Sequence, residues 1–169
     1  DSLTKKRPER ADMVMATTQA AHVGDGVLAK MLAAAKEVEG LAATASNLEK
    51  AQLANWLEKH KTVEDVFKLL KLGDEAGKLF SSPVFSTWIS YAETLSQSSE
   101  ESMASMVRVL RLHRKDETLM NLVAAGKTSS PPFDVKNLSG NLEKMLMEKW
   151  MSSVQSEARV FELMGLKST

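Results

Sequence analysis

Residues 47–56 read NLEKAQLANW, and residues 141–150, ninety-four positions later, read NLEKMLMEKW. Both stretches open with the same tetrapeptide and end, after five further residues, with tryptophan. When residues 47–72 are aligned with 141–166 without gaps, nine of the 26 positions are identical. Two unrelated segments of ordinary composition would share about two. The match therefore indicates an internal repeat, in which one structural unit is written twice.

The composition is that of a globular chain without a strong electrostatic preference. Of the 169 residues 43% are hydrophobic, which is enough for a sizeable core, and 22 basic residues balance 22 acidic ones. With no net field to attract it to nucleic acid, the chain is expected to have no nucleic-acid partner. The absence of cysteine excludes disulfides and thiolate metal sites and suits a reducing compartment. No run of about 18 apolar residues is present, so a transmembrane helix is not expected.

The apolar residues recur with helical spacing almost everywhere, which predicts an all-α fold. The longest expected break is the stretch 127–140, which contains Pro131-Pro132 and is the best candidate for a linker. Ser46 with Glu49, and Thr62 with Asp65, have the spacing of capping boxes and predict helix starts. Helices are expected over about 28–38, 46–60, 62–72, 82–95, 99–112, 119–126, 141–154 and 157–166.

Each copy of the repeat is predicted to form a helix–turn–helix hairpin, with the turn at Thr62 or at Ser156. Trp56 and Trp150 are interpreted as large core anchors. A two-helix hairpin cannot bury its apolar face alone, so each copy needs covering helices. For the first copy, the helix expected over 82–95 provides this cover. Val84, Trp88, Tyr91 and Leu95 lie on one side of it.

The second copy has no such helix after it within the sequence, because residue 169 follows shortly after Leu166. Its face of Trp150, Val160 and Phe161 is expected to be covered by the helices at 99–126. A homodimer or a contact with another protein through this second unit is the alternative.

No pattern of catalytic, cofactor or metal-binding residues emerges from the sequence. The three histidines, His22, His60 and His113, are not paired at helical spacing, so no metal site is predicted. Gly24-Asp25-Gly26 lacks the further residues that a phosphate-binding loop requires, and there is no Gly-x-Ser-x-Gly elbow. We therefore expect no enzyme activity and no cofactor.

Two stretches resemble a known family: Trp56 followed by residues 66–72, VFKLLKL, and residues 83–91, PVFSTWISY. They are similar to the W and Y motifs of the WY-domain effectors, the RxLR-type effectors of oomycete plant pathogens such as Phytophthora. The resemblance implies a small helical bundle with the motif tryptophan and tyrosine in its core. Residues 141–166 resemble a second W motif without a Y motif. No RxLR or EER motif is present near the start; the family carries them in a leader upstream of the folded part.

The resemblance implies a domain organisation in three parts. Residues 1–26 would form an N-terminal arm and first helix, 27–98 a WY helical bundle, and 99–169 a second, incomplete WY-like helical unit. It also implies a set of core positions at the family motifs, namely Trp56, Val66, Phe67, Leu70, Leu72, Trp88, Tyr91, Trp150, Val160, Phe161, Met164 and Leu166.

The function implied by the resemblance is that of a secreted pathogen effector, which enters the plant cell and suppresses immunity by binding a host protein without catalysis. It would act in the host cytoplasm, with the plasma membrane or the nucleus as alternatives. The amphipathic residues 10–38 offer a surface that could lie on a membrane, although packing on the first bundle is favoured. A cytosolic helical-repeat adaptor or scaffold is the alternative function.

Overall fold

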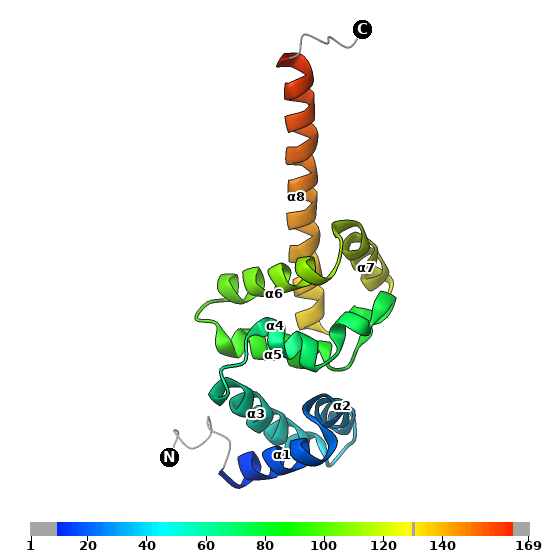
Figure 1. The fold of residues 1–169 in the computed structure, drawn as a ribbon. Helices are drawn as coiled ribbons and strands as arrows, with labels where there is room; N and C mark the ends of the chain where they lie inside the picture. Colours follow the sequence, from blue (N-terminus) through cyan, green and yellow to red (C-terminus); the bar gives the residue numbers. More distant parts are fainter. Residues whose placement is uncertain (1–9, 130, 164–169) are drawn as a thin grey trace.

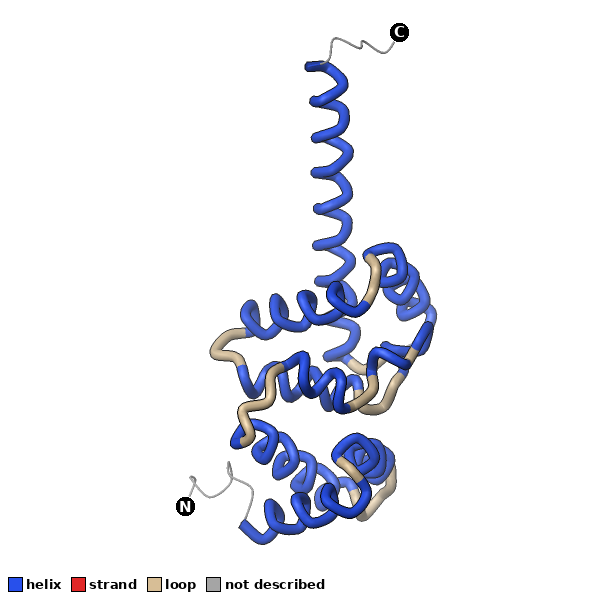
Figure 2. Tube along the Cα trace, in the orientation of Figure 1, coloured by secondary structure: helices blue, strands red, loops and turns tan. Residues whose placement is uncertain are grey.

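A computed structural model of the chain describes residues 10–129 and 131–163, and these residues form helices joined by short turns and loops (Figures 1 and 2). The predicted all-α class is thereby confirmed. In chain order the elements are α1 (Arg10–Val23), α2 (Asp25–Lys36), α3 (Ala42–Glu58), α4 (Val63–Leu69), the short 3-10 helices η1 (Leu72–Asp74) and η2 (Ala76–Ser81), α5 (Phe85–Leu95), α6 (Ser99–His113), α7 (Asp116–Thr128) and α8 (Phe133–Leu163).

Helices α1, α2 and α3 form one layer of the molecule (Figure 1). A small apolar cluster of Leu28, Leu32 and Ala45 holds α2 against α3. Lys36 of α2 and Glu49 of α3 form an ion pair beside it. Helix α3 begins at Ala42 without a side-chain cap, so the predicted start at the Ser46–Glu49 capping box is wrong.

The main core lies among α3, α4, α5, α6 and the beginnings of α7 and α8. It contains the aromatic side chains of α3, α4 and α5 and continues through Leu110 of α6 to Leu146 of α8. This core crosses the predicted division at 98/99, so the two predicted units pack as one body. The domain boundaries themselves stay a prediction.

Helix α8 is 31 residues long and has two unlike halves. Its N-terminal half packs mainly on α7 and also on α5 and α6. The second half leaves the body (Figure 1), and every side chain from Met147 to Arg159 is exposed. The buried residues of the first half are Val135, Leu138, Ser139, Leu142 and Leu146.

Two predictions about this region are wrong. The break between helices is much shorter than 127–140, because α7 continues to Thr128 and α8 begins at Phe133. Pro132 precedes the first helical residue, where proline is tolerated since the first-turn amides have no intrahelical acceptor. The predicted turn at Ser156 is also absent, because α8 is continuous through that position.

The turn that ends α3 shows why the second copy stays straight. His60 adopts a left-handed conformation with φ 51°, while the Lys61 amide donates to the Trp56 carbonyl and the His60 amide to the Leu57 carbonyl. These are the two bonds of a Schellman helix end. The repeat places Val154 at the position of His60, and a β-branched residue is strongly disfavoured in that conformation.

The start of α4 is the second difference between the copies. Thr62 and Asp65 form the predicted capping box, in which each side chain accepts a hydrogen bond from the other residue's amide (3.1 and 2.9 Å). Ser156 and Arg159 stand at the equivalent positions. Arginine has no acceptor to complete the box, so the second copy lacks both the stop signal and the reciprocal start signal of the first.

The repeat extends further back than the sequence match. At the same offset of 94 residues, α6 corresponds to α1, α7 to α2 and the first half of α8 to α3 (Figure 1). In both copies an ion pair joins the W-motif helix to the helix before it: Glu49 pairs with Lys36, and Glu143, at the position of Glu49, pairs with Lys127 (2.5 Å), three residues before the position of Lys36. Buried positions on the second helix also coincide: Leu28, Ala29 and Leu32 correspond to Leu122, Val123 and Gly126.

Candidate binding surface

The motif residues of the first copy lie inside the protein. Trp56 on α3 and Tyr91 on α5 are both fully buried, and their rings meet edge to face at 5.7 Å between centroids. Trp88 meets Phe67 of α4 at 5.2 Å. These side chains are inaccessible to a partner. The other motif positions of this copy, Val66, Leu70 and Leu72, are buried as well.

Both aromatic residues of α5 also hold the turn between α3 and α4. The Tyr91 hydroxyl donates to the Lys61 carbonyl at 2.6 Å, and the Trp88 indole N–H donates to the Val63 carbonyl at 2.8 Å. Burial raises the pKa of Tyr91 above its usual 10.0, and the nearby charge of Asp65 adds to this. The W and Y motifs are thus coupled, since α5 fills the core and fixes the connection in front of it.

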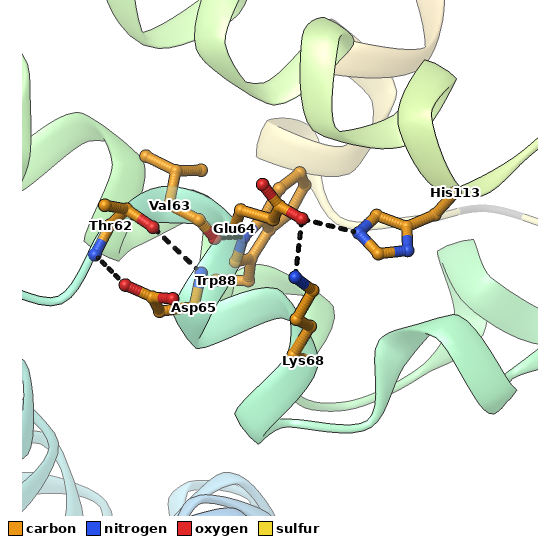
Figure 3. Close-up of polar contacts among 7 residues, drawn as sticks. All are labelled: Thr62, Val63, Glu64, Asp65, Lys68, Trp88 and His113. Atoms are coloured by element: carbon orange, nitrogen blue, oxygen red, sulfur yellow. Dashed lines mark hydrogen bonds and ion pairs between the residues drawn. The ribbon is translucent and has the colours of Figure 1, made fainter.

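Polar contacts tie α6 to α4 on the neighbouring surface (Figure 3). The Glu64 carboxylate lies 2.7 Å from Lys68 and 3.5 Å from His113, and the His113 ring stacks on Phe67 at 4.9 Å. Lys68 in the first place, and His113 after it, hold the pKa of Glu64 below its usual 4.5. Thr62 lowers the pKa of Asp65 through the backbone and side-chain bonds of the capping box. All of these contacts have structural roles.

Metal binding and membrane crossing have no support in the described parts of the chain. Among residues 10–129 and 131–163, no three His, Asp or Glu side chains are grouped so that they could hold a metal ion. Within the same ranges, none of the helices is long and apolar enough to traverse a bilayer.

The second copy places its motif tryptophan on the surface. Trp150 is 64% exposed, so the prediction that it is a core anchor is wrong. The helices at 99–126 cover α8 only as far as Leu146, contrary to the expectation that they would cover this face as well. The side chains of Val160 and Phe161, and residues Met164 and Leu166 altogether, lie outside the part of the chain that the structure describes.

Trp150 belongs to an apolar stripe along the projecting half of α8. Met147 and Val154 stand three and four positions from it along the helix, and Met151 stands four and three positions from those two; all three are between 45 and 54% exposed. Such residues lie on one side of an α-helix. Trp150 and Met147 also border a groove of about 540 Å³ between α7 and α8, whose further lining residues are Asp116, Glu117, Met120, Leu146, Lys149 and Ser153.

Charged residues fix one rim of this groove. Asp116 at the start of α7 accepts hydrogen bonds from Lys149 of α8 (2.5 Å) and from Arg111 at the end of α6 (3.1 Å). Lys149, and after it Arg111, hold the pKa of Asp116 below its usual 3.8. The three helices are thereby joined where the exposed half of α8 begins. The sequence showed that no helix like 82–95 follows the second copy, but it led us to expect the helices at 99–126 to cover Trp150. The groove depends on how α7 meets α8 and could not be seen in the sequence.

The architecture agrees with known proteins. Residues 51–92 match the family model described as the WY-domain of effector PexRD54. The chain is 30% identical over 165 residues to RxLR effector protein PSR2 of Phytophthora sojae, covering 97% of this chain and 24% of that protein. It is 28% identical to RxLR effector protein PexRD25 of Phytophthora infestans, covering 99% of this chain and 54% of that protein.

A solved structure supports the same assignment. The crystal structure of PcRxLR12 superposes with a TM-score of 0.72 at 26% identity, over 90% of this chain and 36% of that one. The chain therefore spans only part of these relatives. The W and Y motifs, the buried Trp56–Tyr91 pair and these similarities agree: residues 51–92 form a WY domain, and the chain is a homologue of RxLR effector proteins of Phytophthora.

Proposed function

We propose that this chain is part of a secreted effector that acts inside the plant cell and suppresses host immunity by binding a host protein, without catalysis. The similarity to RxLR effector proteins supports delivery to the host. The observation that carries the binding role is the exposed stripe around Trp150, on a helix that leaves the body of the protein (Figure 1). Monomeric proteins seldom present contiguous apolar side chains without a partner for them.

The first-copy motifs do not supply this binding surface. Trp56 and Tyr91 are buried, and their hydrogen bonds and ring contacts are internal. The partner is therefore expected to touch surface residues outside these motifs, while the motif residues maintain the bundle.

To test this, the chain is expressed in plant leaf tissue, and the reactive-oxygen burst that follows a microbial elicitor is measured. The host proteins that copurify with the chain are identified in the same tissue. Wild-type chain is expected to lower the burst and to retain a host protein. Trp150→Ser with Met151→Ser should lose both effects at unchanged protein level. Phe133→Ala is the matched control, because Phe133 is an exposed aromatic residue (85%) at the other end of the same helix.

An unchanged burst with the wild-type chain would contradict the proposed function. A fluorescent fusion in the same tissue would assign the compartment, for which the cytoplasm is proposed and the plasma membrane or nucleus are the alternatives.

Membrane-surface contact through residues 10–38 stays a prediction. Val14 and Met15 of α1 are exposed there, and cosedimentation with anionic vesicles would test whether they insert.

A further inference from the structure

Exposed positions of α8 correspond to buried positions of α3. In the first copy, Ala51, Leu53, Asn55 and Trp56 are all buried. Their counterparts at the offset of 94 are all exposed: Met145, Met147, Lys149 and Trp150. Other positions are buried in both copies, as the pairs Ala45 with Ser139 and Gln52 with Leu146 show. The second copy is thus open at several positions that the first copy closes.

Two contacts show which elements cover the corresponding positions in the first copy. Tyr91 of α5 lies against Trp56, as described above. The end of α4 passes over α2 so closely that a Cβ at Gly26 would lie 2.8 Å from the Leu69 carbonyl oxygen. The counterpart of Gly26 is Met120, which lines the groove between α7 and α8. The groove therefore occupies the place where α4 ends in the first copy, and Trp150 stands where α5 would cover it.

The continuation of α8 does not supply this cover. Helix α8 runs straight through Ser156, because Val154 and Arg159 replace the residues that turn the chain in the first copy. The segment equivalent to α4 is consequently carried away from the groove. A long helix half without tertiary contacts is also only marginally stable in water. Within residues 10–129 and 131–163, the groove and Trp150 therefore have no covering element.

The lining of the site defines the chemistry of that element. Its floor is apolar and contains the flexible side chains of Met120 and Met147, which adapt to a partner's shape. At the rim Asp116 is already paired with Lys149 and Arg111. Glu117 is exposed and has no ion pair among the described residues. The site therefore favours an apolar face flanked by positive charge.

We propose that the α7–α8 groove and Trp150 together bind one amphipathic helix of a partner protein, which presents an aromatic side chain to Trp150 and a basic one to Glu117. The helix would take the place that the end of α4 and Tyr91 of α5 take in the first copy. The partner chemistry rests on the proposed function, since it identifies the surface by which the effector holds its host protein.

The chain's own sequence supplies a defined probe for the test. A peptide of residues 82–97 contains α5, the helix that covers Trp56; Phe replaces Trp88 so that the peptide does not fluoresce as tryptophan, and a lysine is added at each end. Trp56 and Trp88 of the chain are fully buried, so quenching by acrylamide reports Trp150. Bound peptide should lower this quenching about twofold or more.

Binding of a labelled peptide, followed by anisotropy, separates the contributions. Trp150→Ala should weaken binding about tenfold or more, and Glu117→Gln a few-fold with a loss of salt dependence. Phe133→Ala in the chain should change nothing. A peptide in which Ser replaces Tyr91 should bind about as poorly as the Trp150→Ala chain binds the original peptide.

Absence of binding, or binding that is indifferent to Trp150→Ala, would overturn the proposal. So would light scattering that shows a dimer of the chain alone, abolished by Trp150→Ala, because a second copy would then be the occupant. A failure of this binding-site proposal can be distinguished from a failure of the proposed function. Peptide binding without an effect on plant immunity contradicts the function alone, and immunity suppression that survives Trp150→Ala contradicts the site alone.

Discussion

The Trp56 and Tyr91 rings meet at 5.7 Å with an angle of 86° between their planes, and the Tyr91 hydroxyl donates to the carbonyl of Lys61, five residues after Trp56. One tyrosine therefore packs on the tryptophan and holds the turn that follows it. Edge-to-face aromatic pairs add about 0.5–1.5 kcal/mol to the burial of the rings. The spacing of the two motif residues follows from this double contact.

The two motif tryptophans are expected to respond oppositely to the same substitution. Trp56→Ala should lower the free energy of unfolding by about 3–5 kcal/mol, because it leaves a cavity in the core. Trp150→Ala should change it by less than about 0.5 kcal/mol, since exposed side chains contribute little. Urea denaturation followed by circular dichroism measures both. Equal losses would show that Trp150 is buried in solution.

Alkaline pH should weaken the first bundle through Tyr91. Its pKa is raised in the folded state, so the folded protein keeps the hydroxyl proton at a pH where the unfolded chain loses it. Stability is complete below the unfolded value near 10 and falls as pH rises towards the folded pKa. Thermal melts between pH 8 and 11 should show a steeper loss for wild type than for Tyr91→Phe, which has no proton to lose. Parallel curves would remove Tyr91 as the cause.

The end of α3 should be sensitive to the residue that takes the left-handed conformation. His60→Val should destabilise the protein by about 1–2 kcal/mol, because valine is strained at φ 51°. His60→Gly should be neutral or slightly stabilising, since glycine accepts this conformation without strain. The difference between the two melting temperatures is the measurement. A valine variant as stable as the glycine variant would show that the turn is relaxed in another way.

Introducing the missing signals should break α8. Val154→Gly combined with Arg159→Asp restores a residue that accepts positive φ and an acceptor for the Ser156 amide. Helix content by circular dichroism should fall, and amide exchange should accelerate at residues 153–156. Val154→Ala with Arg159→Lys serves as control and should leave α8 intact. Unchanged exchange in the first variant would mean that local signals do not decide the turn.

Two glycines offer a matched test of packing. Gly26→Ala should destabilise by about 1–3 kcal/mol, because the new methyl group meets the Leu69 carbonyl oxygen, which cannot easily move. Gly140→Ala in α8 should stabilise by about 0.5–1 kcal/mol, since nothing lies within 4 Å and alanine favours helix. Urea midpoints of the two variants should shift in opposite directions. A stabilised Gly26→Ala variant would contradict the close approach of α4 to α2.

The sequence predicted the helical class and the first copy well because those depend on local periodicity and on residues with clear preferences. Thr62 and Asp65 formed the expected capping box. Pro131-Pro132, in contrast, was interpreted as part of a long linker, although proline is equally at home where a helix begins. The Ser46–Glu49 spacing was misleading because residues 42–45 already continue the helix in front of it.

The second copy was predicted incorrectly because the alignment emphasised the wrong positions. Tryptophan and the Val-Phe pair match between copies, but those residues determine which face is apolar and not where the chain turns. The turn depends on His60 and Asp65, whose counterparts are Val154 and Arg159. That Arg159 cannot complete a capping box was visible in the sequence. The left-handed conformation of His60 was not, since histidine has no strong preference for it.

A straight α8 has a geometric consequence for anything that binds along it. At 1.5 Å per residue the half beyond Leu146 extends about 25 Å from the body, and its base is braced by Asp116, which Lys149 and Arg111 hold from two sides. The helix therefore sets both the distance from the body and the angle at which a second protein is held. Adding or removing a single residue within it would rotate the attached partner by about 100° around the axis, so insertions in this half should be far less tolerated than substitutions.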